Sequence, residues 1–161
     1  NLIFLNNSDI EKILKKKSFI QSFQIKKIYP NILKIKIFEK KPIAILNHNK
    51  KKYYLSEKID VIDFLDLEQY EKLPTIFGDQ KSFETLYNNL KKTNFPFDLI
   101  KSCHLYESKR WDIVIYGKKT IKLPLKNYVK SLENFINLRK KSVFDKYEVF
   151  DYRLNNQLIL K

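Results

Sequence analysis

The segment from Phe19 to Leu46 constrains the fold more than any other part of the chain. Two runs in it alternate apolar and polar residues at a period of two, which is typical of strands with one buried face. The apolar positions are Phe23, Ile25, Leu33, Ile35 and Ile37. Between the runs, residues 29–32 place proline second and asparagine third, as β-turns prefer. The pattern predicts a β-hairpin with one apolar face and one solvated face.

Residues 8–17 are predicted to form a short helix before this hairpin. Ser8 and Glu11 have the spacing of a capping box, and the apolar residues that follow fall on one side at helical spacing. After the hairpin, Glu39 closes the second strand, and Pro42 is expected to stop it from pairing further with the same partner.

The rest of the chain alternates strand and helix patterns without a flexible linker. We expect a second hairpin around a turn at residues 47–51, short strands near 59–62, 121–123 and 158–160, and strands at 100–106, 111–116 and 147–153. A helix capped by Ser82 should end by Asn94, and another should run from Tyr128 to Arg139. In residues 73–78, Pro74 suggests an edge strand or a turn, and Gly78 suggests a positive φ before the helix.

The residues that usually carry catalysis or bind cofactors do not cluster in this sequence. With only two glycines among 161 residues, there is no phosphate-binding glycine loop. Cys103 and His104 are adjacent on a predicted strand and should therefore point to opposite faces. His48 lies in a polar turn, and Asp60, Asp63 and Asp66 have no histidine near them in sequence. We therefore expect no catalytic residues, no metal site, no cofactor and no small-molecule substrate.

The net charge of +14 raises the alternative of a basic nucleic-acid-binding domain. However, only three of the 32 basic residues are arginine, and the lysines are spread over every segment. Specific base and phosphate recognition relies on the arginine fork, so the lysines fit solvated faces better. We expect no specific nucleic acid partner, although the alternative stays open.

Four short motifs occur in an order that resembles the FtsQ/DivIB family of bacterial cell-division proteins. They are E-x-x-P-x-A at Glu39, Pro42 and Ala44, L-P-x-I-x-G at residues 73–78, R-W-D at residues 110–112, and D-x-R at Asp151 and Arg153. The hairpin before the first motif resembles the end of the family's POTRA domain. Two departures are the lack of a glycine at residues 56–58 and Gln157 in place of the family's usual glycine.

The resemblance implies an α+β fold with two domains. Residues 1–44 would be a partial POTRA domain made of a helix and a β-hairpin, whose first strand and first helix would lie upstream. Residues 45–161 would be a mainly antiparallel β domain with two helices. A fragment that begins at Asn1 should then be less stable, or more self-associating, than a longer one, because a strand edge would be bare.

The function that the resemblance implies is a non-catalytic scaffold of the divisome. Such a scaffold is anchored in the inner membrane by one helix, which would lie upstream of this sequence, and faces the periplasm at the division septum. It binds the division proteins FtsB and FtsL and helps to control septal peptidoglycan synthesis.

The resemblance also implies where a partner would bind. In the family, a segment of FtsB pairs with the last strand of the β domain, here residues 153–161. The expected partner-binding residues are Tyr152, Arg153, Leu154, Asn156, Leu158 and Leu160. For Leu158 and Leu160, alternation along the strand leaves open that they face the core instead.

Overall fold

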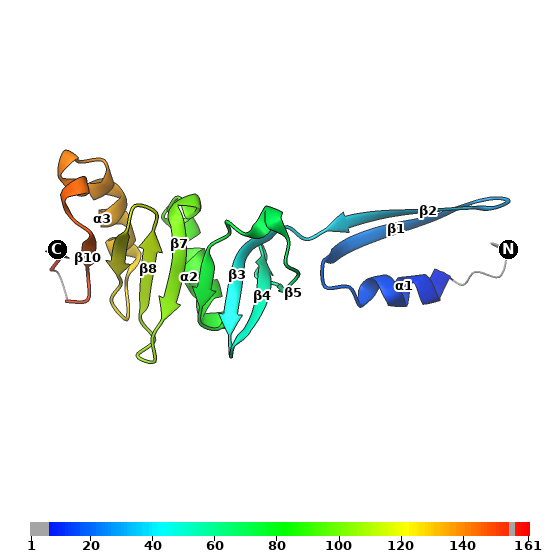
Figure 1. Ribbon diagram of the computed structural model, residues 1–161, viewed down its shortest axis with the longest axis horizontal. Helices are drawn as coiled ribbons and strands as arrows, with labels where there is room; N and C mark the ends of the chain where they lie inside the picture. Colours follow the sequence, from blue (N-terminus) through cyan, green and yellow to red (C-terminus); the bar gives the residue numbers. More distant parts are fainter. Residues whose placement is uncertain (1–6, 155–156) are drawn as a thin grey trace.

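The computed structural model describes residues 7–154 and 157–161. Figure 1 shows an elongated α+β molecule, with helix α1 (Asn7–Lys15) and a two-stranded sheet at one end and a nine-stranded sheet over the rest. The predicted fold class is therefore confirmed.

The predicted hairpin is formed by β1 (Ile20–Ile28) and β2 (Ile32–Glu39). The strands are antiparallel, and the register pairs Phe23 with Ile37 and Ile25 with Ile35, as the alternation requires. Helix α1 runs alongside β1, close to the predicted position. It leaves Ile35 and Ile37 39% and 45% exposed, so the apolar face is only partly covered.

The nine-stranded sheet has the order β11-β10-β9-β8-β7-β6-β3-β4-β5. The strands that come first in the sequence are β3 (Pro42–His48), β4 (Lys51–Ser56), β5 (Val61–Asp63) and β6 (Thr75–Phe77). The strands that come later in the sequence are β7 (Ile100–Leu105), β8 (Trp111–Ile115), β9 (Lys119–Lys122), β10 (Val149–Asp151) and β11 (Ile159–Leu160). Among the described residues, only the β3–β6, β6–β7 and β9–β10 pairs are parallel.

Strand β6 lies in the interior of the sheet, so the expectation of an edge strand or a turn at residues 73–78 was wrong. It pairs in parallel with both β3 and β7. Pro74 precedes the strand and contributes only its carbonyl oxygen, which accepts a hydrogen bond from the Ile45 amide at 2.9 Å. Because the missing proline N–H falls outside the strand, it costs no ladder hydrogen bond.

Gly78 is needed for space and not for a positive φ, which corrects the second expectation for this motif. A Cβ atom at this position would lie 3.0 Å from both the Leu105 Cβ and the Trp111 Cη2 atoms. A glycine therefore lets the chain pass close to the indole ring of the R-W-D motif. Among the described residues, the positive-φ glycine is Gly117, in the turn between β8 and β9.

Helix α2 (Gln80–Lys92) is capped by Asp79 and not by Ser82. The Asp79 carboxylate accepts hydrogen bonds from the Ser82 amide and hydroxyl, both at 2.8 Å, so Ser82 is the residue that is bonded by the cap. Burial alone would raise the pKa of Asp79, but the hydrogen bonds from Ser82, together with the nearby Lys109, hold it below its usual value.

The core lies between one face of the sheet and the helices α2 and α3 (Val129–Arg139). Phe83 of α2 packs edge-on against Trp111 of β8, and Phe135 of α3 packs edge-on against Phe150 of β10. Cys103 is fully buried on this side, whereas His104 lies on the other face and stacks on Phe77, with 4.6 Å between the two ring centroids. The predicted separation of Cys103 and His104 is confirmed.

Short 3-10 helices complete the fold at Glu68–Tyr70 (η2), Phe97–Leu99 (η3) and Ser142–Lys146 (η4). The last of these is tied to the sheet by Lys119, whose buried ammonium group donates to the carbonyl oxygens of Phe144, Asp145 and Tyr147 at 3.2, 3.4 and 2.7 Å. This lysine is therefore structural, unlike those on the solvated faces.

Where the hairpin meets the large sheet, aromatic rings surround Tyr54 of β4. Phe19, Phe64 and Tyr70 lie 6.0, 4.8 and 5.3 Å from its ring, and its hydroxyl donates to the Leu65 carbonyl oxygen. Close by, Ser18 is bonded to Asp63 of β5, and Lys40 forms an ion pair with Asp60. The two sheets are thus joined by specific packing.

Candidate functional site: the β11 edge of the large sheet

The candidate site is the edge strand β11 at the C-terminal end of the large sheet. This strand pairs with β10 on one side, and no other strand among the described residues pairs with its outer side. Val149 and Lys161 exchange two backbone hydrogen bonds, of 2.9 and 3.1 Å, across the β10–β11 pair. Backbone groups alternate in direction along an antiparallel strand, so the N–H and C=O of Leu160 point toward the bare edge.

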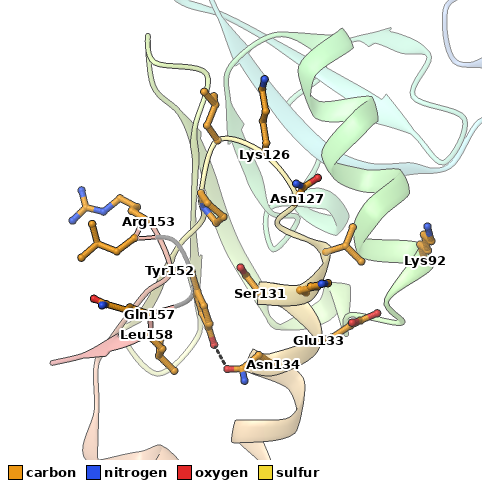
Figure 2. A pocket seen from close by; sticks show the side chains of 15 residues that line it. Lys92, Lys126, Asn127, Ser131, Glu133, Asn134, Tyr152, Arg153, Gln157 and Leu158 are labelled. Carbon is orange, nitrogen blue, oxygen red and sulfur yellow. Dashed lines mark hydrogen bonds between the residues drawn. The ribbon is translucent and has the colours of Figure 1, made fainter.

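A groove of about 1080 Å³ lies beside the segment that leads into this strand. One wall comes from α3 and the loop before it, and the other from the segment that leads into β11 (Figure 2). Both polar and apolar side chains line it, including Leu125, Lys130 and Asn134 on the first wall and Leu154 and Leu158 on the second. A concave surface next to a free strand edge can hold a peptide by main-chain pairing and side-chain contacts together.

Tyr152 connects the two walls of the groove. Its ring is buried, and its hydroxyl donates a hydrogen bond of 2.9 Å to the Asn134 side-chain oxygen on α3 (Figure 2). Burial raises the pKa of the phenol, so this hydroxyl stays protonated and remains a donor. The bond therefore fixes the distance between α3 and the segment before β11.

Arg153 and Asp151 form a charge pair at the entrance of the groove. The arginine Nε donates to one carboxylate oxygen at 2.8 Å and Nη2 donates to the other at 2.5 Å, a bidentate arrangement. These hydrogen bonds are the main reason why the pKa of Asp151 lies below its usual range. Asp151 is buried, whereas the arginine side chain is 38% exposed, so part of the guanidinium remains accessible.

The six sequence-predicted site residues differ in their accessibility. Leu154 is 53% exposed, Arg153 is exposed at the groove, and Tyr152 is buried with its ring in the wall. Leu158 and Leu160 are half-buried and pack against the core, the alternative that strand alternation had left open. Asn156 lies outside the described residues. The structure thus brings Tyr152, Arg153, Leu154 and Leu158 to one groove.

Sequence reasoning missed the α3 wall of this groove. Lys130, Ser131 and Asn134 lie on the helix that the sequence predicts from Tyr128 to Arg139. A position on the polar side of a predicted helix does not by itself indicate a groove. The facing wall is distant in sequence, since Tyr152 and Asn134, which share a hydrogen bond, are 18 residues apart. Only the long-range pairing of β10 with β9 brings the two together.

The described residues offer no sign of a metal centre or of a membrane span. No group of three His, Cys, Asp or Glu side chains is arranged to hold a metal ion within residues 7–154 and 157–161. In the same part of the chain, each helix is too short or too polar to cross a bilayer.

Comparison with known proteins gives consistent relatives. A family model described as "Cell division protein FtsQ/DivIB, C-terminal" matches residues 44–153. "Cell division protein FtsQ" of Rickettsia bellii (strain RML369-C) is 26% identical over 165 residues, which cover 100% of this chain and 61% of that protein. The protein of the same description from Coxiella burnetii (strain RSA 493 / Nine Mile phase I) is 23% identical over 167 residues, which cover 97% of this chain and 66% of that protein.

A solved structure has a weaker likeness. The major extracytoplasmic domain of the cell-division protein DivIB from Geobacillus stearothermophilus is 13% identical, with a TM-score of 0.42. The match covers 68% of this chain and 97% of that domain.

The family match spans more than two thirds of the sequence and includes the nine-stranded sheet from β3 to β10, ending before β11. The chain itself corresponds to about 60% of the length of the Rickettsia proteins. The motifs, the sheet and the family match agree, and the chain belongs to the FtsQ/DivIB family of cell-division proteins.

Proposed function

We propose that this chain is the partner-binding part of a non-catalytic divisome scaffold, and that a segment of FtsB pairs with the outer edge of β11. The observation that carries the proposal is the bare β11 edge beside a groove that contains Leu154 and Arg153. An incoming strand would bond to the main chain of Leu160, while side chains at the groove would supply specificity. The bidentate Asp151 pair holds Arg153 ready for an acidic or polar group of the partner.

The wider role in the proposal follows from family membership. The scaffold would hold FtsB and FtsL at the septum and so help to control septal peptidoglycan synthesis. It would be anchored by an upstream helix in the inner membrane, with this region in the periplasm. The proposal divides the chain into a partial POTRA domain, residues 1–44, and a β domain, residues 45–161; this boundary lies within β3, after its first three residues.

Proline at Leu160 tests the edge directly. Leu160→Pro removes an outward N–H, whereas Ile159→Pro removes an N–H on the side that faces β10, so the second variant should weaken the fold instead. We expect Leu160→Pro to keep its melting temperature within a few degrees and to lose about tenfold or more in affinity for FtsB of the same organism, measured by calorimetry. A folded Leu160→Pro with unchanged affinity would exclude β11 as the docking edge.

The alternative of a nucleic-acid-binding domain has a simple test. Retention on heparin or DNA that is selective for sequence and persists at physiological salt would favour it over the scaffold. Weak retention that disappears with salt is the result that we expect.

A further inference from the structure

The hairpin at the other end of the molecule has an exposed face that matches no role in the proposed function. The even-numbered residues of β1 and β2 share this face, and the register pairs them across the strands. All eight are exposed: Ser22, Gln24, Lys26, Ile28, Ile32, Lys34, Lys36 and Phe38. We call them the even-numbered face. Helix α1 lies along β1, and the hairpin tip projects away from the large sheet (Figure 1).

The charge of this end is strongly positive, although on α1 Lys12 pairs with Asp9 and Lys15 with Glu11. Residues 12–38 contain no aspartate or glutamate and eight lysines, namely Lys12, Lys15, Lys16, Lys17, Lys26, Lys27, Lys34 and Lys36. On the even-numbered face, Lys26 lies directly opposite Lys34. Like charges at such a position destabilise a strand pair. The ion pairs found among the described residues involve none of Lys26, Lys34 and Lys36.

Apolar side chains lie at the tip, beyond the lysines. Ile28 and Ile32 face each other at the last pair of the hairpin and are 39% and 54% exposed, and Tyr29 in the turn is 69% exposed. The lysine pair precedes this apolar pair by two residues, which corresponds to about 7 Å along a strand. An apolar group with lysines about 7 Å behind it matches the depth of about 5–10 Å to which interfacial segments enter a bilayer.

We propose that the tip of the β1–β2 hairpin binds an anionic phospholipid bilayer. Ile28, Tyr29 and Ile32 enter the boundary between head groups and acyl chains, and Lys26, Lys34 and Lys36 contact lipid phosphates. The exposed apolar tip favours a bilayer over a nucleic acid, because phosphate contacts alone leave these side chains in water. The hairpin also has no arginine, which phosphate recognition on nucleic acids commonly uses. The proposal does not depend on the β11 site.

Vesicle binding with matched variants tests the charge. The 161-residue chain is sedimented with vesicles of phosphatidylcholine alone or mixed with phosphatidylglycerol. We expect binding only to the mixed vesicles, and a loss of about a hundredfold for K26Q/K34Q/K36Q, since each lysine near an anionic surface contributes about fivefold. The control K81Q/K101Q/K140Q removes the same charge from exposed lysines elsewhere and should lose far less. An equal loss in both triple variants would overturn the proposal, because binding would then depend on net charge alone.

A second pair of variants tests the apolar tip. I28S/I32S should lose vesicle binding about as strongly as the lysine variant. The control L65S/Y116S changes two apolar side chains elsewhere, each 52% exposed, and should keep its vesicle binding. In Tyr29→Trp, the new indole should shift its fluorescence to the blue with mixed vesicles, because Trp111 is already buried. Unchanged binding by I28S/I32S, or DNA binding that depends on the same lysines with no blue shift on vesicles, would assign the face to polyanions and not to a bilayer. Circular dichroism confirms that each variant is folded.

Discussion

The two edges of the nine-stranded sheet are built differently. At the β5 edge, the Asp63 amide donates to the Ser18 hydroxyl at 3.0 Å, and that hydroxyl donates to the Asp63 carboxylate at 2.8 Å. Next to this edge, the ring of Phe19 from the hairpin side packs against Tyr54, which also contacts Phe64 and Tyr70. At the β11 edge, the outward backbone groups have no strand beside them among the described residues, and a groove lies beside the segment that leads into this strand.

This difference suggests that the β5 edge contributes to the stability of the fold, whereas the β11 edge is available for binding. A bare strand edge is a risk for aggregation, and proteins usually cover or disrupt it. Here one edge is closed by the chain itself, while the other is only two residues long and stays open. We infer that the β5 edge serves to fix the hairpin to the sheet, and that the β11 edge is kept for a partner. The following predictions test this contrast.

The largest effect is expected at the closed edge. Tyr54→Ala removes a side chain that is 1% exposed and contacts three other rings, so the free energy of unfolding should fall by about 3–5 kcal/mol in urea denaturation. Leu154→Ala at the open edge should change it by less than about 0.5 kcal/mol, because the leucine is 53% exposed. Similar losses in both variants would mean that the two edges contribute alike to stability.

A smaller effect is expected for Asp151→Asn at the open edge. The hydrogen bonds from Arg153 keep the pKa of Asp151 below its unfolded value, so this carboxylate stabilises the fold above about pH 4 and loses that contribution as the pH falls through the folded pKa. We expect a loss of about 1–2 kcal/mol at neutral pH, reduced by the partial exposure of Arg153. The difference between wild type and variant should shrink in urea denaturations below pH 4; a difference that is constant with pH would contradict this assignment.

The smallest effect is expected for Ser18→Ala. The change removes both hydrogen bonds to Asp63 and should cost about 1 kcal/mol. Hydrogen exchange at the Asp63 amide should become faster, because its acceptor is lost. Ser22→Ala, on the exposed face of β1, is the matched control and should alter neither quantity. Unchanged exchange at Asp63 would show that Ser18 does not close this edge.

Local patterns predicted most of the elements but not how they pair. The hairpin, the helices and much of the strand alternation follow from residue spacing, but Phe150, Asp151 and Tyr152 are all buried, which alternation alone does not predict. Spacing gives no information on long-range parallel pairing, so neither the interior place of β6 nor the β9–β10 contact could be predicted. Pro74 was misleading because the rule on proline applies within a ladder, and this proline lies before it.

Some backbone positions also differ from what residue type suggests. The turn between β4 and β5 needs a positive φ without a glycine, and Ile59 adopts it at +62° while its side chain stays buried. A β-branched residue pays a steric cost in this region, so the packing around Ile59 must offset it. No pattern in residues 56–58 indicates which residue takes the strained conformation.

The buried position of Cys103 has a consequence for the redox chemistry of the chain. Burial raises the pKa of this thiol, the sequence has no second cysteine, and the side chain is fully enclosed. A thiol that neither ionises nor meets oxidants resists sulfenic acid formation and disulfide exchange. The chain can therefore keep a reduced cysteine in an oxidising compartment without cross-linking to its neighbours, and a cysteine introduced at the surface would react alone with a thiol probe.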